Sequence, residues 1–255
     1  MLYRLFLYPV AIWVFASACF AEDQTEPSKN APPPNSAAAV PDEVRSTFAR
    51  LQNYIQNKPL DFDSSFEARA DGDELYRGSI HFLLSQPNLL RAQASYGQAS
   101  YLIVSDGTVM TIYNPAQKKF SQSAAPSSLA QAFGYFSGEI GVDSQVLNFL
   151  SVVEDAAAGS DDFKLSAGGS ETIGGHQCDK FTVTGKLGDN WWEAWLEKGD
   201  VPLLCRVVYH NVDGPTQVNE FSWKPTPTLS KDTFVFTPPA GSTKVDIGDL
   251  NLAAP

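Results

Sequence analysis

The sequence predicts an α+β fold in which helices gather on one face of a curved antiparallel sheet. Three observations support this fold class. The predicted elements follow the order helix, strands, helices, strands. The connections between successive strands are short, which favours antiparallel pairing because parallel strands need long crossovers. The first helix carries a single apolar stripe, which has to pack against another layer.

The first predicted element is a helix from Pro41 to Asn57, "PDEVRSTFARLQNYIQN". Proline suits the first helical turn, and Asp42 and Glu43 stabilise the positive end of the helix dipole. We expect the apolar stripe of this helix to face a sheet. The stripe consists of Val44, Phe48, Leu51 and Ile55, which recur at helical spacing.

Alternating apolar residues predict strands through most of the remaining chain. Asp71-Gly72 and Asp106-Gly107 lie between such runs and are strong hairpin signals. The alternation breaks between Pro126 and Ala158, where "SSLAQAFGYF" and "VDSQVLNFLSVVEDA" predict two helices joined by an irregular, glycine-rich "GYFSGEIG". Strands return as "HQCDKFTVTG", "NWWEAWLEK", "PLLCRVVYHN" and "TQVNEFSWK", and the chain closes with "DTFVFTPPAGSTKV".

The N-terminal residues predict export. Arg4 precedes an apolar run from Leu5 to Ala18, and small residues then lead into an acidic continuation. This pattern is typical of a secretory signal peptide, and the run is short for a membrane span of roughly 20 residues. We predict a signal peptide over residues 1–21, cleaved after Ala21, and a soluble periplasmic protein that is not integral to the membrane. The alternative is cleavage before Cys19 and a lipid anchor there.

Composition predicts a disordered linker over residues 22–40, rich in Pro, Ser and Ala, and a single domain over residues 41–250. Loss of Arg4 with the signal peptide takes the formal charge from −11 to −12. A net acidic chain without a run of basic residues repels phosphate backbones. Nucleic acid is therefore excluded as a partner.

Two cysteines, Cys178 and Cys205, remain after signal cleavage. An even pair in an oxidising compartment suggests a disulfide. Both fall on predicted strands with a third strand between them, which would hold them about 9–10 Å apart, too far for a bridge in a regular sheet. We expect two free, buried thiols, with the disulfide as the alternative.

The sequence contains no catalytic or metal-binding motif. Its histidines, His81, His176 and His210, lack zinc-site spacing, and no nucleophile elbow or phosphate loop occurs. Glu193 and Glu197 lie among tryptophans, and acids beside aromatic rings occur in some carbohydrate sites. The simpler interpretation is a strand that packs its apolar side chains on one side and meets solvent on the other. We expect no enzyme activity, no cofactor and no metal.

The stretch Tyr101 to Phe120, "YLIVSDGTVMTIYNPAQKKF", predicts a hairpin whose second strand is apolar on both faces. Met110 and Ile112 share one face, and Val109 and Tyr113 share the other. A twisted sheet of many strands curls. Short helices over the hollow face of such a sheet would leave an apolar cavity, and a filled core is the alternative.

Several motifs resemble a known family. "SIHFLLSQPNLLRAQASYGQASYLIVSDGTVMTIYNPAQKKF" and "FVFTPPAG" resemble motifs of the periplasmic lipoprotein carrier LolA, in the same order. "GHQCDKFTV", "WWEAWLEKGDVPLL" and "CRVVY" look more like a related family of predicted periplasmic proteins of unknown function with the LolA/LolB-like fold. The resemblance runs from about Val40 to Asp246. It implies an unclosed antiparallel β-barrel with helices as a lid over a hydrophobic cavity, which in the carrier holds lipoprotein acyl chains.

One departure from the carrier concerns its lid. In the carrier, an arginine stands just before the proline that matches Pro87, and this arginine controls lid closure. This chain has Gln86 at that place, and glutamine lacks the charge and the five N–H donors of a guanidinium group. The departure puts gating by that route and a lipoprotein cargo in question. Strand parity and the resemblance together nominate a cavity wall of Phe82, Leu84, Gln86, Leu90, Ala92, Met110 and Ile112.

The sequence thus predicts a non-enzymatic periplasmic binding protein that holds a lipid or lipid-linked ligand, such as an acylated protein, in envelope lipid or lipoprotein trafficking. The alternative is an envelope interaction or stress-sensor protein on the same scaffold, which serves a protein partner and carries no lipid.

Overall fold

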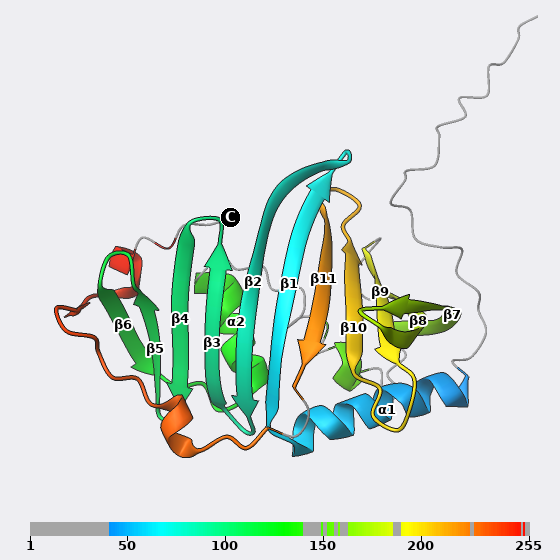
Figure 1. Cartoon of the computed structure of the whole chain (residues 1–255), viewed down its shortest axis with the longest axis horizontal. Helices are drawn as coiled ribbons and strands as arrows, with labels where there is room; N and C mark the ends of the chain where they lie inside the picture. The colour runs from blue at the N-terminus through cyan, green and yellow to red at the C-terminus, as the bar shows by residue number, and fades with distance from the viewer. Residues whose placement is uncertain are drawn as a thin grey trace, which may run out of the picture.

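The computed structural model shows a long, curled sheet with helices along one side (Figure 1). The signal peptide and linker predicted for residues 1–40, and most of the second helix predicted around Val146, lie outside the described residues. The structure describes residues 41–139, 149, 152–155, 158, 163–185, 190–224, 227–250 and 252.

The strands of the described residues all join one sheet in the order β12-β6-β5-β4-β3-β2-β1-β11-β10-β9-β8-β7. Those before the helical segment are β1 Leu60–Ala70, β2 Asp73–Ser85, β3 Leu89–Tyr96, β4 Ala99–Asp106, β5 Val109–Asn114 and β6 Lys119–Ala124. Those after it are β7 Phe163–Ile173, β8 His176–Gly185, β9 Trp191–Glu197, β10 Leu204–His210, β11 Thr216–Trp223 and β12 Thr243–Lys244.

The sheet is antiparallel, curved and unclosed, which confirms the predicted fold class. Among the described strands, only β12 and β6 pair in parallel, over two residues each, and the two end strands β12 and β7 do not pair with each other. In Figure 1, β7 and β8 lie across the view whereas β3 to β5 stand upright, so the sheet turns strongly along its length. Both predicted Asp-Gly hairpins are present; at the first, Asp71 and Gly72 have φ values of 53° and 90°.

Helix α1, Asp42–Asn57, confirms the first predicted element. Its stripe packs on the half of the sheet formed by β7 to β10, where the ring of Phe48 meets that of Phe181 edge-on at 5.5 Å. We call this the α1 cluster. It consists of Val44, Phe48, Leu51, Phe149, Val152, Val153, Phe163, Leu165, Phe181, Val183, Trp192, Ala194, Leu196, Leu204 and Val207.

Helix α2, Leu129–Glu139, lies behind β2 and β3 in Figure 1. The helix continues through "GYFSGE", so the irregular structure predicted for "GYFSGEIG" was wrong as far as Glu139, and the last two residues of that segment lie outside the described residues. Burial of Leu129, Ala132 and Phe133 outweighs the low helix propensity of glycine. These side chains join the α2 cluster on the same face. It also contains Leu60, Phe62, Phe66, Ile80, Phe82, Leu84, Leu90, Ala92, Ala94, Tyr96, Tyr101, Ile103, Met110, Ile112 and Leu250.

The other face of β4 and β5 is covered by a C-terminal segment. The 3-10 helix η1, Lys231–Phe234, lies over β3 and β4, and Phe234 is fully buried there. Arg91 donates a hydrogen bond to the carbonyl oxygen of Thr233 (3.3 Å), and the ring of Phe236 lies 5.6 Å from that of Tyr113. This segment explains why the strand around Met110 is apolar on both faces.

Cys178 and Cys205 form a disulfide, so the expectation of free thiols was wrong. The predicted strand order was right, because β8 and β10 flank β9. Cys178 pairs with Glu197, the last residue of β9, and the register of β10 shifts around Cys205, which is the extra residue of a β-bulge. The two Cα atoms are therefore only 6.6 Å apart, and the bridge passes over the end of β9.

Candidate ligand-binding cavity

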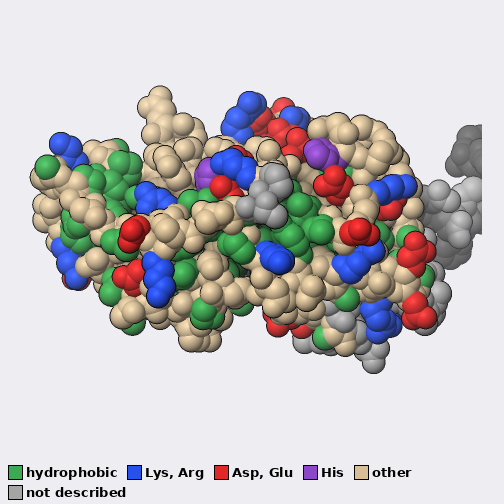
Figure 2. All heavy atoms as spheres, turned by 60° about the horizontal axis from the view of Figure 1, so that its bottom comes forward, with side chains coloured by type: hydrophobic (Ala, Val, Ile, Leu, Met, Phe, Trp, Pro, Cys, Tyr) green, Lys and Arg blue, Asp and Glu red, His purple; other side chains and the backbone are tan. Residues whose placement is uncertain are grey.

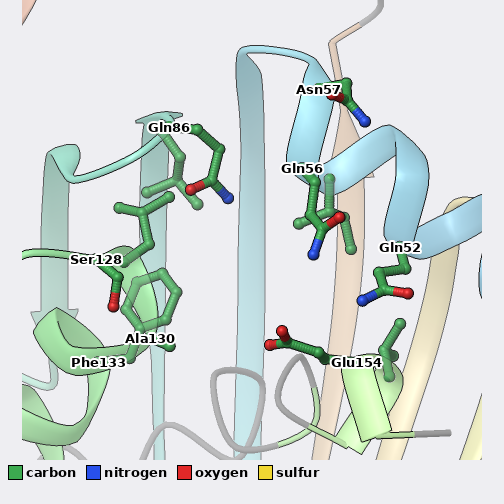
Figure 3. A pocket seen from close by; sticks show the side chains of 12 residues that line it. Gln52, Gln56, Asn57, Gln86, Ser128, Ala130, Phe133 and Glu154 are labelled. Atoms are coloured by element: carbon green, nitrogen blue, oxygen red, sulfur yellow. The ribbon is translucent and has the colours of Figure 1, made fainter. Parts of the chain in front are cut away.

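A cavity of about 600 Å³ opens between α1, α2 and the end of β2 (Figure 3). This volume lies within the range of about 300–1,000 Å³ that is typical of small-molecule sites. Its apolar lining comes from α1, β2 and α2 and from Val153, all of which the two hydrophobic clusters hold in place. The lining residues are Gln52, Ile55, Gln56, Asn57, Leu84, Gln86, Ser128, Leu129, Ala130, Phe133, Val153 and Glu154.

The polar lining of the cavity consists mainly of amides. In Figure 3, Gln86 extends into the space from the end of β2, while Gln52 and Gln56 extend from α1 on the opposite side. Glu154 adds one carboxylate, and the described lining contains no lysine or arginine. A buried anion needs a cationic partner, so this lining suits an uncharged ligand better than a phosphate or carboxylate.

The start of α2 is anchored to the turn between β2 and β3. The backbone N–H of Leu129 donates to the carbonyl oxygen of Pro87 (2.8 Å). The side-chain amide of Asn88 donates to the carbonyl oxygens of Gly107 (3.0 Å) and Pro126 (2.9 Å). Gln86, in the same turn, makes no side-chain hydrogen bond to another described residue. The side chain that fixes this end of α2 is therefore Asn88.

The candidate wall residues nominated from sequence separate into two groups. Leu84 and Gln86 line the cavity. The other five lie on the same face of the sheet but are buried in the α2 cluster, beneath the helix, and do not line the open space: Phe82, Leu90, Ala92, Met110 and Ile112.

Sequence reasoning missed the contribution of α1 to the cavity. Gln52 and Gln56 line the cavity from α1, where they lie beside its apolar stripe. Polar residues at such positions normally face solvent. No signal in the local sequence distinguishes them from other exposed amides. Ile55 is the exception, because it belongs to the predicted stripe and is only partly buried, packing against both clusters.

The acids flanked by tryptophans on β9 are engaged in polar side-chain contacts on the outer face. Glu193 contacts Lys180 and His210, the latter at 3.2 Å, and Glu197 contacts His176 at 2.8 Å. Burial of Glu193 acts to raise the pKa of its carboxyl, but the hydrogen bonds from His210 and Lys180 outweigh it and the pKa is lowered. A carboxylate held ionised in this way is not a general acid at neutral pH.

A family model described as "Predicted periplasmic protein (DUF2092)" matches residues 62–248. The chain belongs to this family. The match confirms the family resemblance of the sequence and spans the chain from β1 to η2, Ile247–Leu250. The sequence of this protein matches none of the curated proteins.

Solved structures with a similar chain course share little sequence with this DUF2092 protein. They include an uncharacterized conserved protein from Thermus thermophilus (10% identity, TM-score 0.48, covering 80% of this chain and 99% of that one). LprF from Mycobacterium bovis has 12% identity and a TM-score of 0.47, and the match covers 76% of this chain and 98% of that one. The LolA superfamily protein NE2245 from Nitrosomonas europaea has 14% identity and a TM-score of 0.32, and the match covers 78% of this chain and 99% of that one. At these values the comparisons carry no information about ligand or partner.

The surface of this DUF2092 protein is mixed in charge. Figure 2 brings forward the lower side of the Figure 1 view, along which α1 lies. It shows basic and acidic side chains intermixed, with hydrophobic side chains between them near the middle. Within the described part of the chain, no helix has the length and apolar character to cross a bilayer. The same residues hold no group of three or more His, Cys, Asp or Glu side chains suited to a metal ion.

Proposed function

We propose that this protein is a non-enzymatic periplasmic binding protein that holds a lipid or lipid-linked ligand in the cavity beneath α1 and α2. The observation that carries the proposal is the cavity itself, which has apolar side chains from α1, β2, α2 and Val153 in its wall and a described lining without a basic side chain. Affinity would come from apolar burial, at roughly 25 cal/mol per Å². The family description as periplasmic supports the compartment.

The proposed site extends beneath α2. Phe82, Leu90, Ala92, Met110 and Ile112 belong to the same cluster as the buried side chains of α2. When α2 turns away about the end that Asn88 anchors, these five residues become additional wall, and an acyl chain replaces the contacts that the helix makes in the closed state. Opening of this kind exchanges one apolar partner for another and costs little net burial.

Native mass spectrometry of the protein purified from its own envelope tests the proposal. A co-purified lipid, together with uptake of a fluorescent fatty acid ester by delipidated protein, is the expected result. A ligand-free protein that neither takes up the probe nor carries lipid, but co-purifies with an envelope protein, would instead support the interaction or sensor alternative.

The N-terminus of the purified protein decides how it resides in the periplasm. We expect a mature chain that begins at Glu22 and is free in solution. Mass analysis that found a lipid-modified Cys19 would replace this with a membrane-tethered binding protein.

A further inference from the structure

The centre of the concave face carries a polar group of side chains between the two apolar clusters. Ser64 lies on β1, and Gln217 and Asn219 lie on β11, the strand next to it. All three are buried, with exposed fractions of 1%, 4% and 1%. We call them the polar triplet.

Strand register places the triplet on one face. Ser64 is opposite Phe221, and Phe66 is opposite Asn219, so Ser64 and Asn219 are diagonal neighbours with Cα atoms roughly 7–8 Å apart. Phe66 and Phe221 both pack in the cluster beneath α2, which fixes this face as the concave one. The triplet therefore points to the same side of the sheet as the cavity.

Two atoms of the triplet lack hydrogen-bond partners among the described residues. Gln217 donates to the side-chain oxygen of Asn219 at 3.4 Å, but Ser64 Oγ and Asn219 Nδ2 are buried and unpaired. Buried donors are almost always satisfied, and an unsatisfied one is costly. Their presence in the middle of an apolar face indicates that something else supplies an acceptor.

The surroundings of the triplet determine the kind of acceptor. Among the described residues, its cross-strand neighbours on the concave face are uncharged, and include Ala68 opposite Gln217 and Val207 opposite Asn219. A buried carboxylate or phosphate would need a cation, whereas a neutral carbonyl oxygen needs only hydroxyl and amide donors. The geometry points to a subsite for the uncharged carbonyl of an ester or amide, at the head of an acyl chain.

The distance from the cavity to the triplet suits an extended chain. Leu84, which lines the cavity, pairs with Leu60 at the start of β1, and Ser64 lies four residues further along that strand. Four residues of strand span about 13 Å. The rings of Phe62, Phe82 and Trp223 stack across this interval, with centroids 5.0 Å and 4.4 Å from Phe62. An acyl chain would cross this aromatic layer and place its carbonyl at Asn219.

This inference rests on the proposed function. Binding of two ligands, one with and one without a carbonyl group, tests the subsite separately from the proposed function. Methyl laurate and tetradecane have similar chains but only the first has a carbonyl, and each would be titrated against the uncharged probe N-phenyl-1-naphthylamine. We expect wild-type protein to prefer the ester by about tenfold, the effect of one well-made hydrogen bond to a buried donor. Asn219→Leu should abolish this preference, because it removes the unpaired Nδ2 donor. Its Tm does not bear on the subsite, because the same change also leaves the buried amide of Gln217 without its acceptor.

Ser64→Ala provides a second variant in case Asn219→Leu does not fold, and should reduce the ester preference in the same direction. Asn114→Leu is the matched control. Asn114 is also buried, but its amide donates to the carbonyl oxygen of Leu250 at 3.2 Å. This control should lower Tm and leave the preference for the ester unchanged.

Equal binding of ester and alkane by the wild-type protein would overturn the subsite and leave the proposed function standing. An ester preference that persists in folded Asn219→Leu would show that Asn219 does not donate to the ligand, and would also overturn the subsite. Failure of the probe to bind at all would overturn the proposed function and the subsite with it.

Discussion

Cys178 on β8 is bonded to Cys205 on β10 across the end of the intervening strand β9. The bridge belongs to a small outer-face cluster with Ile173, Trp195 and Val208. Lys180 and Arg206 lie over the ring of Trp195, at 5.0 Å and 5.5 Å from its centroid. The outer face of this half of the sheet is thus held by a covalent bond and by cation–π contacts, independently of the helices on the other face.

Removal of this disulfide should destabilise the protein strongly. The bridge closes a loop with a sequence separation of 27, for which chain entropy predicts about 3–4 kcal/mol. The double variant Cys178→Ala, Cys205→Ala should show this loss in urea denaturation, and wild-type protein in reductant should match it. Denatured wild-type protein should react with an alkylating reagent only after reduction; reaction without reductant would disprove the bridge.

The lowered pKa of Glu193 should make stability depend on acid pH. The folded-state pKa lies below the ordinary value of 4.5, so the stabilisation is present above that value and is lost as pH falls through the folded pKa. Glu193→Gln should cost about 1 kcal/mol at pH 7, the scale of a partly buried ion pair. The gap between the two proteins in denaturation midpoint should close at strongly acid pH, and a gap that stays constant would contradict this assignment.

Asn88 should control the attachment of α2 more than Gln86 does. Asn88→Ala removes two hydrogen bonds to backbone carbonyls and should cost about 1–2 kcal/mol. Hydrogen exchange should then accelerate in residues 127–133, together with release of a bound probe. Gln86→Ala, in the same turn, is the control and should leave exchange in α2 unchanged; equal acceleration in both variants would rule out Asn88 as the anchor.

Two alanines on α2 distinguish the cavity from the core beneath it. Ala130 lines the cavity and is exposed, whereas Ala132 is fully buried in the α2 cluster. Ala130→Trp should fill the cavity and weaken uptake of a fluorescent fatty acid ester at little cost in stability. Ala132→Trp should overpack the core and cost about 1–3 kcal/mol or more. Full probe affinity in folded Ala130→Trp would place the ligand elsewhere.

Ile112→Trp tests the proposed extension of the site under α2. Ile112 is buried in the closed state, so the larger ring should cost about 1–3 kcal/mol. It should also weaken probe uptake, because the ring occupies space that opens when α2 moves. A loss of stability with unchanged probe affinity would show that Ile112 is core only and that the ligand stays within the open cavity.

Much of the fold could be predicted because it depends on local periodicity. The stripe through Val44, Phe48 and Leu51 identified α1, and alternation identified the strands and their inward faces. Met110 and Ile112 were assigned to the inner face correctly, since side chains on a strand alternate strictly. The family and the curved antiparallel sheet followed from the same motifs.

The candidate site could be predicted only in part. Leu84 and Gln86 were nominated from the sequence and line the cavity. Gln52 and Gln56 were not nominated; they lie on α1, which precedes β1 in the chain. Which flank of α1 faces the cavity depends on where its apolar stripe docks. That docking involves β7 to β10, which come more than a hundred residues later in the chain.

By itself, the sequence determined the class of this protein and the direction in which most side chains point, because a period of 2 or 3.6 residues and an Asp-Gly turn act over a few residues. Only the tertiary structure decided the disulfide, which needs a bulge at Cys205 and the end of β9 to coincide. It also decided the continuation of α2 through glycines and the position of Ser64 diagonally across from Asn219 on neighbouring strands. Each of these depends on contacts between strands or layers, whose energies exceed local preferences and are not encoded in any single segment.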